Sequence, residues 1–183
     1  GLLGPPGTGG LYIGNRVDLD SLREGGTGLY SEQEEQPVTL PFRYESGTPN
    51  SVGISGLGAG LKFIFSEGLE AIRAYEKDLA SRIIDGLSNI PEVNLYTACD
   101  LSKQAPAISF NIEGYEPMEV GVILDQAFDI RVRTGLHCAP AAHKALGTYH
   151  LGTIRLSPGY FNTTEEIDFT IEAIAKIAEA RNV

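Results

Sequence analysis

The sequence has few cysteines, little positive charge and no long apolar run. Its two cysteines, Cys99 and Cys138, lie far apart and outside any CxxC spacing, which argues against a disulfide scaffold and a zinc site. No stretch approaches the ~18 consecutive apolar residues of a membrane span, and the chain does not open with a basic segment followed by an apolar one. We therefore expect a cytoplasmic protein that is not a membrane protein.

Cationic residues are too scarce for binding to polyanions. Lysine and arginine total 14 against 24 aspartates and glutamates, which gives a net charge of -10. This balance argues against nucleic acid and anionic membranes as partners. Small molecules and other proteins remain.

The texture of the chain changes about a third of the way along its 183 residues. Residues 1–65 are rich in glycine loops, whereas residues 66–183 carry regular amphipathic patterns. We expect residues 1–65 to be the end of a larger domain and residues 66–183 to form a smaller one.

The hydrophobic pattern alternates between the periods of helices and strands. In the first part it predicts a strand at 9–13 and a helix at 49–65, with Thr48 as the N-cap and Pro49 at the first helical position. Thr163 and Glu166 have the spacing of a capping box that opens a final helix. The remaining expected elements are helices at 68–88, 117–127 and 139–146 and strands at 93–97, 107–112, 129–133 and 153–157. Helices interleaved with strands predict a layered α/β or α+β domain with helical crossovers.

Cys138 lies in the segment RTGLHCAP, after a predicted strand and directly before a short predicted helix. A thiol near a helix start and near arginine or histidine is favoured as the nucleophilic thiolate. The alternative is a small buried apolar residue without chemistry. Cys99, on a predicted loop, has no comparable surroundings.

Arg155 lies in a predicted strand between apolar neighbours. Its guanidinium suits a carboxylate bound by two parallel hydrogen bonds, as in an amino-acid substrate, although a structural ion pair fits as well. Thr48 and the glycine loop at 25–28 offer hydroxyls and backbone N–H groups for an oxyanion, although ordinary capping and turns also explain them. Metal binding is not expected, because no suitable spacing of ligands surrounds His137, His143 or His150.

Four segments in order resemble the class V aminotransferase family of pyridoxal-phosphate enzymes. GLLGPPGTGGLYI resembles the stretch after the cofactor lysine, REGGTG and ESGTPN resemble two phosphate-contacting loops reached across a dimer interface, and RTGLHCAP resembles the cysteine loop of cysteine desulfurases and selenocysteine lyases. The resemblance runs over the whole chain. It implies the end of the large domain of a pyridoxal-phosphate transferase plus the small C-terminal α/β domain, with a sheet packed against helices.

The resemblance assigns roles to single residues. It implies that Cys138 is the catalytic cysteine and Arg155 the arginine that binds the substrate carboxylate. It also implies that Thr48, together with Gly26 and Thr27, contacts the cofactor phosphate of the neighbouring subunit. Arg133 and His137 match residues that flank the cysteine and have possible supporting roles, while Leu136 replaces a histidine found in some members.

The implied reaction removes sulfur from L-cysteine with pyridoxal 5′-phosphate as cofactor. The Cys138 thiolate would take the sulfur as a persulfide, alanine would leave, and an acceptor protein or small thiol would carry the sulfur towards iron–sulfur or thio-cofactor synthesis. A homodimer is implied as well. The alternatives are a selenocysteine lyase, another class V aminotransferase, or a dimerisation or binding module without catalysis.

The lysine that binds the cofactor in this family would precede Gly1. The five lysines present stand in other contexts, at Lys62, Lys77, Lys103, Lys144 and Lys176. We therefore expect these 183 residues to be inactive alone, to bind no cofactor alone, and to derive from a chain about twice as long.

Overall fold

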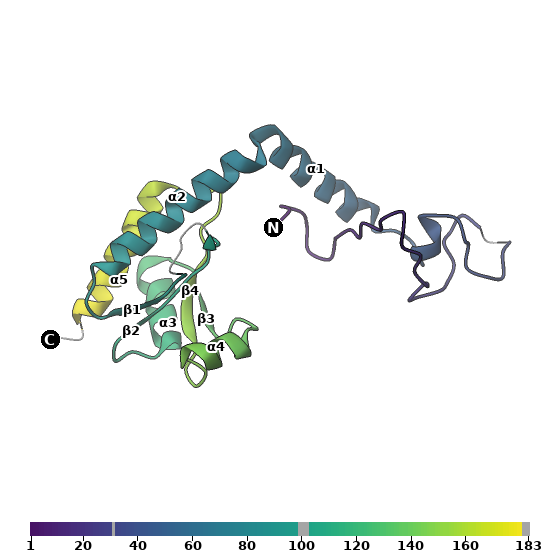
Figure 1. The fold of residues 1–183 in the computed structure, drawn as a ribbon. Helices are drawn as coiled ribbons and strands as arrows, with labels where there is room; N and C mark the ends of the chain where they lie inside the picture. Colours follow the sequence, from purple (N-terminus) through teal and green to yellow (C-terminus); the bar gives the residue numbers. More distant parts are fainter. Residues whose placement is uncertain (31, 99–102, 181–183) are drawn as a thin grey trace. The chain divides into compact units, whose positions relative to one another are not determined.

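The computed structural model describes residues 1–30, 32–98 and 103–180 (Figure 1). Within it the chain divides into two compact units, Gly1–Gly68 and Leu69–Val183, here called the first and second units. The division falls at Gly68, where a positive φ of 88° ends a helix. Cys99 lies outside the described residues.

The first unit contains one long helix and extended loops. A short 3₁₀ helix, η1 (Phe42–Tyr44), precedes α1 (Ser51–Glu67). The helix predicted at 49–65 is confirmed but begins two residues later, and the prediction that Thr48 is its N-cap is wrong. Asn50 is the N-cap, because its side-chain oxygen accepts a hydrogen bond from the Gly53 N–H at 3.0 Å and so satisfies a first-turn donor. Thr48 is thereby left free for another role.

The strand predicted at 9–13 is also wrong. Leu11 and Tyr12 are 76% and 91% exposed, and the described residues of the first unit offer no strand to pair with this segment. The start of the chain packs on α1 instead: a Cβ added to Gly60 would lie only 2.6 Å from the Leu2 carbonyl oxygen. A β-prone sequence without a hydrogen-bonding neighbour remains an extended loop.

The second unit is built on a four-stranded sheet. Its strands are β1 (Val93–Tyr96), β2 (Ile108–Ile112), β3 (Arg133–Gly135) and β4 (Thr153–Leu156). Their order is β1-β2-β4-β3, and every neighbouring pair is antiparallel. Because β2 and β3 both oppose β4, they run parallel to each other, and helix α3 (Pro117–Phe128) connects them. The expected layered domain with a helical crossover is confirmed.

The strand predicted at 129–133 lies later, at β3. Asp129 has a left-handed φ of 53° and caps α3, and its N–H still bonds to the Asp125 carbonyl. The Ile130 N–H also returns to the helix, at the Leu124 carbonyl. Residues up to Val132 therefore form the exit from α3, and pairing with β4 begins only at Arg133.

One face of the sheet carries the core. The helices α2 (Leu69–Ser88), α3 and α5 (Thr164–Ala180) pack against it (Figure 1). The helix predicted at 68–88 is confirmed as α2, and it contributes buried side chains to the core, although Leu69 at its start is 65% exposed. The most fully buried large side chains are Phe110, Leu79, Ile83, Leu87, Ile108, Ile112, Leu124, Ile154 and Ile174.

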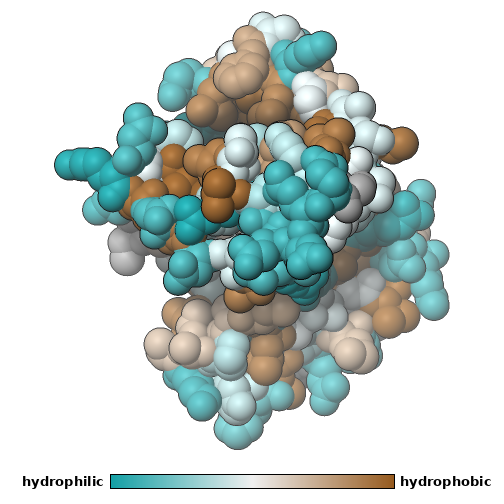
Figure 2. Space-filling model, turned by 90° about the vertical axis from the view of Figure 1, so that its right-hand side faces the viewer, coloured by the Kyte–Doolittle hydropathy of each residue, from teal (hydrophilic) through white to brown (hydrophobic). Residues whose placement is uncertain are grey.

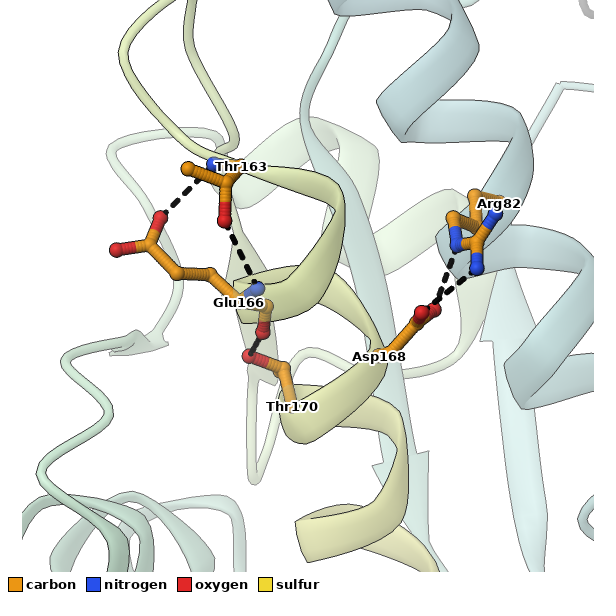
Figure 3. Close-up of polar contacts among 5 residues, drawn as sticks. All are labelled: Arg82, Thr163, Glu166, Asp168 and Thr170. Carbon is orange, nitrogen blue, oxygen red and sulfur yellow. Dashed lines mark hydrogen bonds and ion pairs between the residues drawn. The ribbon is translucent and has the colours of Figure 1, made fainter.

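The predicted capping box at the start of α5 is confirmed (Figure 3). The Glu166 N–H donates to Thr163 Oγ1 at 3.2 Å, and the Thr163 N–H donates back to Glu166 Oε2 at 3.0 Å. One turn along, Asp168 accepts two hydrogen bonds from the Arg82 guanidinium of α2, one of them at 2.6 Å (Figure 3). The capping box marks where α5 begins, and the exposed Arg82–Asp168 pair links α5 to α2.

None of the helices in the described part of the chain has both the length and the apolar character needed to cross a bilayer. Nor do three or more His, Cys, Asp or Glu side chains among the described residues gather where they could hold a metal ion.

Candidate active site

A row of polar side chains occupies the sheet face opposite the core. The register sets Ser109 of β2 against Arg155 of β4, and Arg155 against Arg133 of β3. Side chains directly opposite each other across antiparallel strands lie on the same face. Ile154 and Leu156, which alternate with Arg155, are buried in the core. Two arginines therefore stand side by side on the face opposite the core.

The Arg155 guanidinium has no partner among the described residues. It forms no ion pair there, and its Nε is buried without a hydrogen-bond acceptor. Of the two interpretations open from the sequence, a structural ion pair and a grip on a ligand carboxylate, the geometry favours the second. A half-buried cation with an unpaired donor is suited to a planar anion that offers two oxygens.

Cys138 lies at the surface beside Arg133. Arg133 Nη2 is 3.7 Å from Cys138 Sγ, and the side chain of the cysteine is exposed. The expected helix that follows is α4 (Pro140–Leu146), which begins two residues later. Cys138 is thus not a buried apolar residue. The adjacent guanidinium sets a positive charge where the sulfur would carry a negative one.

His137 points inward from the same loop. Its Nε2 lies 3.1 Å from both the carbonyl oxygen and Oγ1 of Thr153, whereas its Nδ1 is buried without a partner among the described residues. A carbonyl only accepts, so Nε2 carries the hydrogen. Burial, and secondarily the charge of Arg155, lowers the pKa of His137. The ring is therefore neutral near pH 7.

Sequence reasoning missed two residues of this cluster. Thr153 is fully buried and holds His137. Asn111 of β2 donates from Nδ2 to the Gly152 carbonyl at 3.1 Å, and its Oδ1 is buried and unpaired among the described residues. Both act through strand register, which leaves no local signal in the sequence.

The first unit contains a separate hollow that brings together two of its predicted residues. Thr27 and Thr48 both line a cavity of about 530 Å³. A hydrogen bond of 2.8 Å from the Gly47 N–H to the Gly26 carbonyl ties the two loops together. The other lining residues are Gly28, Leu29, Pro41, Phe42, Glu45, Gly47, Pro49 and Ile54.

The predicted site residues thus form two groups. Cys138, Arg133, His137 and Arg155 meet in the second unit, and Gly26, Thr27 and Thr48 meet in the first. The two groups differ in their chemistry. The group in the second unit places positive charge near a thiol, and the group in the first unit places hydroxyls at glycine-rich turns.

Residues 2–169 match the model of the aminotransferase class-V family. The chain belongs to this family. The resemblance found in four sequence segments is therefore confirmed. The family match covers nearly the whole chain.

Individual relatives of this class V chain are cysteine desulfurases. It is 35% identical to a probable cysteine desulfurase of Methanothermobacter thermautotrophicus, in an alignment of 183 positions that covers 97% of this chain and 45% of the relative. It is 33% identical to a cysteine desulfurase of Salmonella agona, covering 96% of this chain and 43% of that protein. The chain spans less than half the length of these curated relatives.

Solved structures agree on the fold. Apo cysteine desulfurase from Thermococcus onnurineus NA1 superposes with a TM-score of 0.72 and 38% identity, over 76% of this chain and 34% of that one. The predicted fold class, an α/β arrangement with a sheet packed against helices, is confirmed.

Proposed function

We propose that this chain forms part of a pyridoxal-phosphate-dependent cysteine desulfurase that converts L-cysteine to L-alanine and leaves a persulfide on Cys138. The single observation that carries the proposal is that the exposed Cys138 thiol lies beside Arg133. Arg133 of β3 in turn lies opposite Arg155 of β4, whose Nε has no hydrogen-bond partner among the described residues. The kinship with cysteine desulfurases supports it.

Arg155 is proposed to bind the substrate carboxylate. Its Nε has no hydrogen-bond partner among the described residues, and the side chain lies on the sheet face opposite the core, so the guanidinium can offer two parallel hydrogen bonds. This contact orients the amino acid, so that its sulfur faces Cys138 rather than solvent.

Cys138 is proposed to be the nucleophile. Arg133 lies beside the sulfur and would stabilise the thiolate that attacks. A sulfur–sulfur bond forms between Cys138 and the substrate as the substrate carbon–sulfur bond breaks. The electron pair of the broken bond stays on the substrate carbon, which takes up a proton and leaves as alanine.

The hollow of the first unit fits the phosphate of the cofactor. Thr27 and Thr48 offer hydroxyls, and their glycine-rich turns leave the backbone open. The Gly26 carbonyl accepts a hydrogen bond from the Gly47 N–H. Glu45 also lines the hollow, and its carboxylate opposes a second negative charge on that side. When bound, pyridoxal phosphate withdraws electrons from the amino acid and weakens its carbon–sulfur bond.

The wider assignments rest on the same kinship. Residues 1–65 would belong to a larger cofactor-binding domain and residues 66–183 to a smaller one. In a homodimer, the phosphate that Thr27 and Thr48 contact would belong to the cofactor of the second copy. A protein or small thiol would accept the sulfur, in the cytoplasm, as the low cysteine content suggests.

The test compares the purified full-length protein with its Cys138→Ala variant on cysteine and on selenocysteine. We expect the variant to lose alanine release from cysteine while the absorbance of the bound cofactor is unchanged. A variant that keeps its turnover on cysteine would point to an aminotransferase instead. Turnover on selenocysteine alone would point to a selenocysteine lyase.

A further inference from the structure

The reactive cysteine lies in a turn that its residues do not favour. His137 and Cys138 have φ values of 50° and 59°, and the Ala139 N–H donates to the Leu136 carbonyl at 2.8 Å. Two central residues with positive φ and this hydrogen bond are the pattern of a type I′ turn, which prefers Asn-Gly. Side chains with a Cβ adopt it at a cost, so other contacts must hold it.

One such contact is the one between His137 and Thr153. Both oxygens of Thr153 lie 3.1 Å from His137 Nε2, and Thr153 is fully buried in β4. The strands themselves approach closely here, because a Cβ added to Gly152 would lie 2.5 Å from the Gly135 backbone. The imidazole therefore connects the turn to a buried and closely packed part of the sheet.

We propose that His137 is a positioning residue: by donating from Nε2 to Thr153 it holds the His137–Cys138 turn closed and so keeps the Cys138 sulfur beside Arg133. This inference rests on the proposed function for its catalytic consequence. The effect on the thiol itself does not depend on it.

The protonation state of His137 bears on this hold. Arg155 of β4, Arg133 of β3 and His143 of α4 face the ring, the last with ring centroids 5.7 Å apart. A second proton would sit on the buried Nδ1, which has no acceptor among the described residues, and would meet these positive charges. Since folding lowers the pKa of His137, the neutral ring contributes stability above the ordinary pKa of 6.5, and this contribution is lost as pH falls through the lowered value.

The experiment measures the rate at which Cys138 reacts with 2,2′-dithiodipyridine, which reports thiols across a wide pH range. The purified full-length protein carries Cys99→Ser, so that of this chain's two cysteines only Cys138 reports. Reaction of the same protein with Cys138→Ala is subtracted. His137→Ala, His137→Gln and the exposed control His150→Gln are compared.

At neutral pH we expect His137→Ala to change the Cys138 rate about tenfold, the scale of releasing one strained turn residue. His137→Gln restores the wild-type rate, because its amide can donate to Thr153, and His150→Gln leaves the rate as it was. As the pH falls below the ordinary 6.5 and through the lowered pKa of His137, the ratio of the wild-type rate to that of His137→Gln departs from its neutral value, because glutamine at this position does not titrate.

An unchanged rate in His137→Ala, the same change in His137→Gln as in His137→Ala, or a pH-independent ratio would overturn the proposal. If His137→Ala does not fold by circular dichroism, Thr153→Val provides the second variant. It removes one of the two acceptors and is expected to change the rate about threefold; no change would equally overturn the inference.

Turnover separates the catalytic consequence from the proposed function. His137→Ala should lower kcat for cysteine and leave KM unchanged, because Arg155 is untouched. If the wild-type protein releases no alanine at all, the proposed function fails while the thiol measurement still decides the role of His137.

Discussion

The two units differ in where their apolar side chains lie. The second unit buries a core of leucine, isoleucine and phenylalanine between its sheet and helices. Among the described residues of the first unit only Pro37, Gly53 and Gly60 are buried, while Leu11, Tyr12 and other large apolar side chains are exposed. Figure 2 shows brown, hydrophobic residues at the surface beside teal, hydrophilic ones. The second unit thus has a hydrophobic core of its own, whereas the described residues of the first unit form none.

The largest expected effect tests this difference directly. Phe110→Ala in the second unit should cost about 3–5 kcal/mol of unfolding free energy, because Phe110 is fully buried. Phe65→Ala in the first unit should cost less than about 0.5 kcal/mol, because Phe65 is 81% exposed. Urea unfolding followed by circular dichroism measures both. Equal losses would show that another surface covers α1.

The next comparison separates substrate from cofactor. Arg155→Met should raise the KM for cysteine about a hundredfold, since a charge-assisted double hydrogen bond is lost. Steady-state kinetics of the full-length protein measures it. Arg131→Met, at an 83% exposed side chain of the same unit, is the matched control and should leave KM unchanged. A KM unaffected by Arg155→Met would remove this residue from the substrate site.

A smaller effect is expected in the first unit. Thr48→Val should weaken pyridoxal-phosphate binding about tenfold, because one hydroxyl donor to the phosphate is replaced by a methyl group. A fluorescence titration of the full-length apoprotein measures it. Thr8→Val, whose hydroxyl donates to the Pro5 carbonyl in a surface turn, is the control and should bind normally. Loss of cysteine affinity instead of cofactor affinity would reverse the assignment of the two units.

Helix caps should reveal the same contrast more weakly. Thr163→Ala removes the cap of α5 and should cost about 1 kcal/mol, visible as a lower Tm. Asn50→Ala removes the corresponding cap of α1 but should leave that Tm unchanged, because the first unit adds no core to the cooperative transition. A matching loss in both variants would indicate that the units unfold together.

The smallest effect concerns the exposed pair of Arg82 and Asp168. The hydrogen bonds from Arg82 lower the pKa of Asp168 below its ordinary 3.8. The pair therefore contributes stability above that value, and the contribution is lost as the pH falls through the lowered pKa. Asp168→Asn should lower Tm slightly at neutral pH, less in high salt, and not at all in strong acid. A Tm difference that persists in acid would contradict this.

Much of the second unit was predictable because its pattern is local. Apolar spacing identified α2 and α5, and the Thr163–Glu166 box located the start of α5. The start of β3 was not predictable, because the left-handed Asp129 ends α3 in a way that no glycine announces. The N-cap of α1 was misplaced by two residues, since Thr48 and Asn50 are both good capping residues and only the fold distinguishes them.

The sequence named four of the residues that gather in the second unit, but neither their geometry nor the contributions of Thr153 and Asn111. Cys138, Arg133, His137 and Arg155 were all identified from sequence, and the structure brings them together. That Arg133 faces the sulfur and that His137 faces Thr153 depends on how β3 pairs with β4. Pairing across 20 residues depends on register and leaves no mark on either segment alone.

The insertion of β4 between β2 and β3 sets the order in which this region can be completed. During synthesis β2, α3 and β3 emerge first, and β3 has no neighbour until Leu156 has left the ribosome. Until then His137 of the cysteine loop lacks its contact with Thr153 of β4. The edges of β2 and β3 that β4 later covers stay open to other chains. Nascent chains stalled before Gly152 should therefore be prone to aggregate, and chaperones should engage them until the last strand arrives.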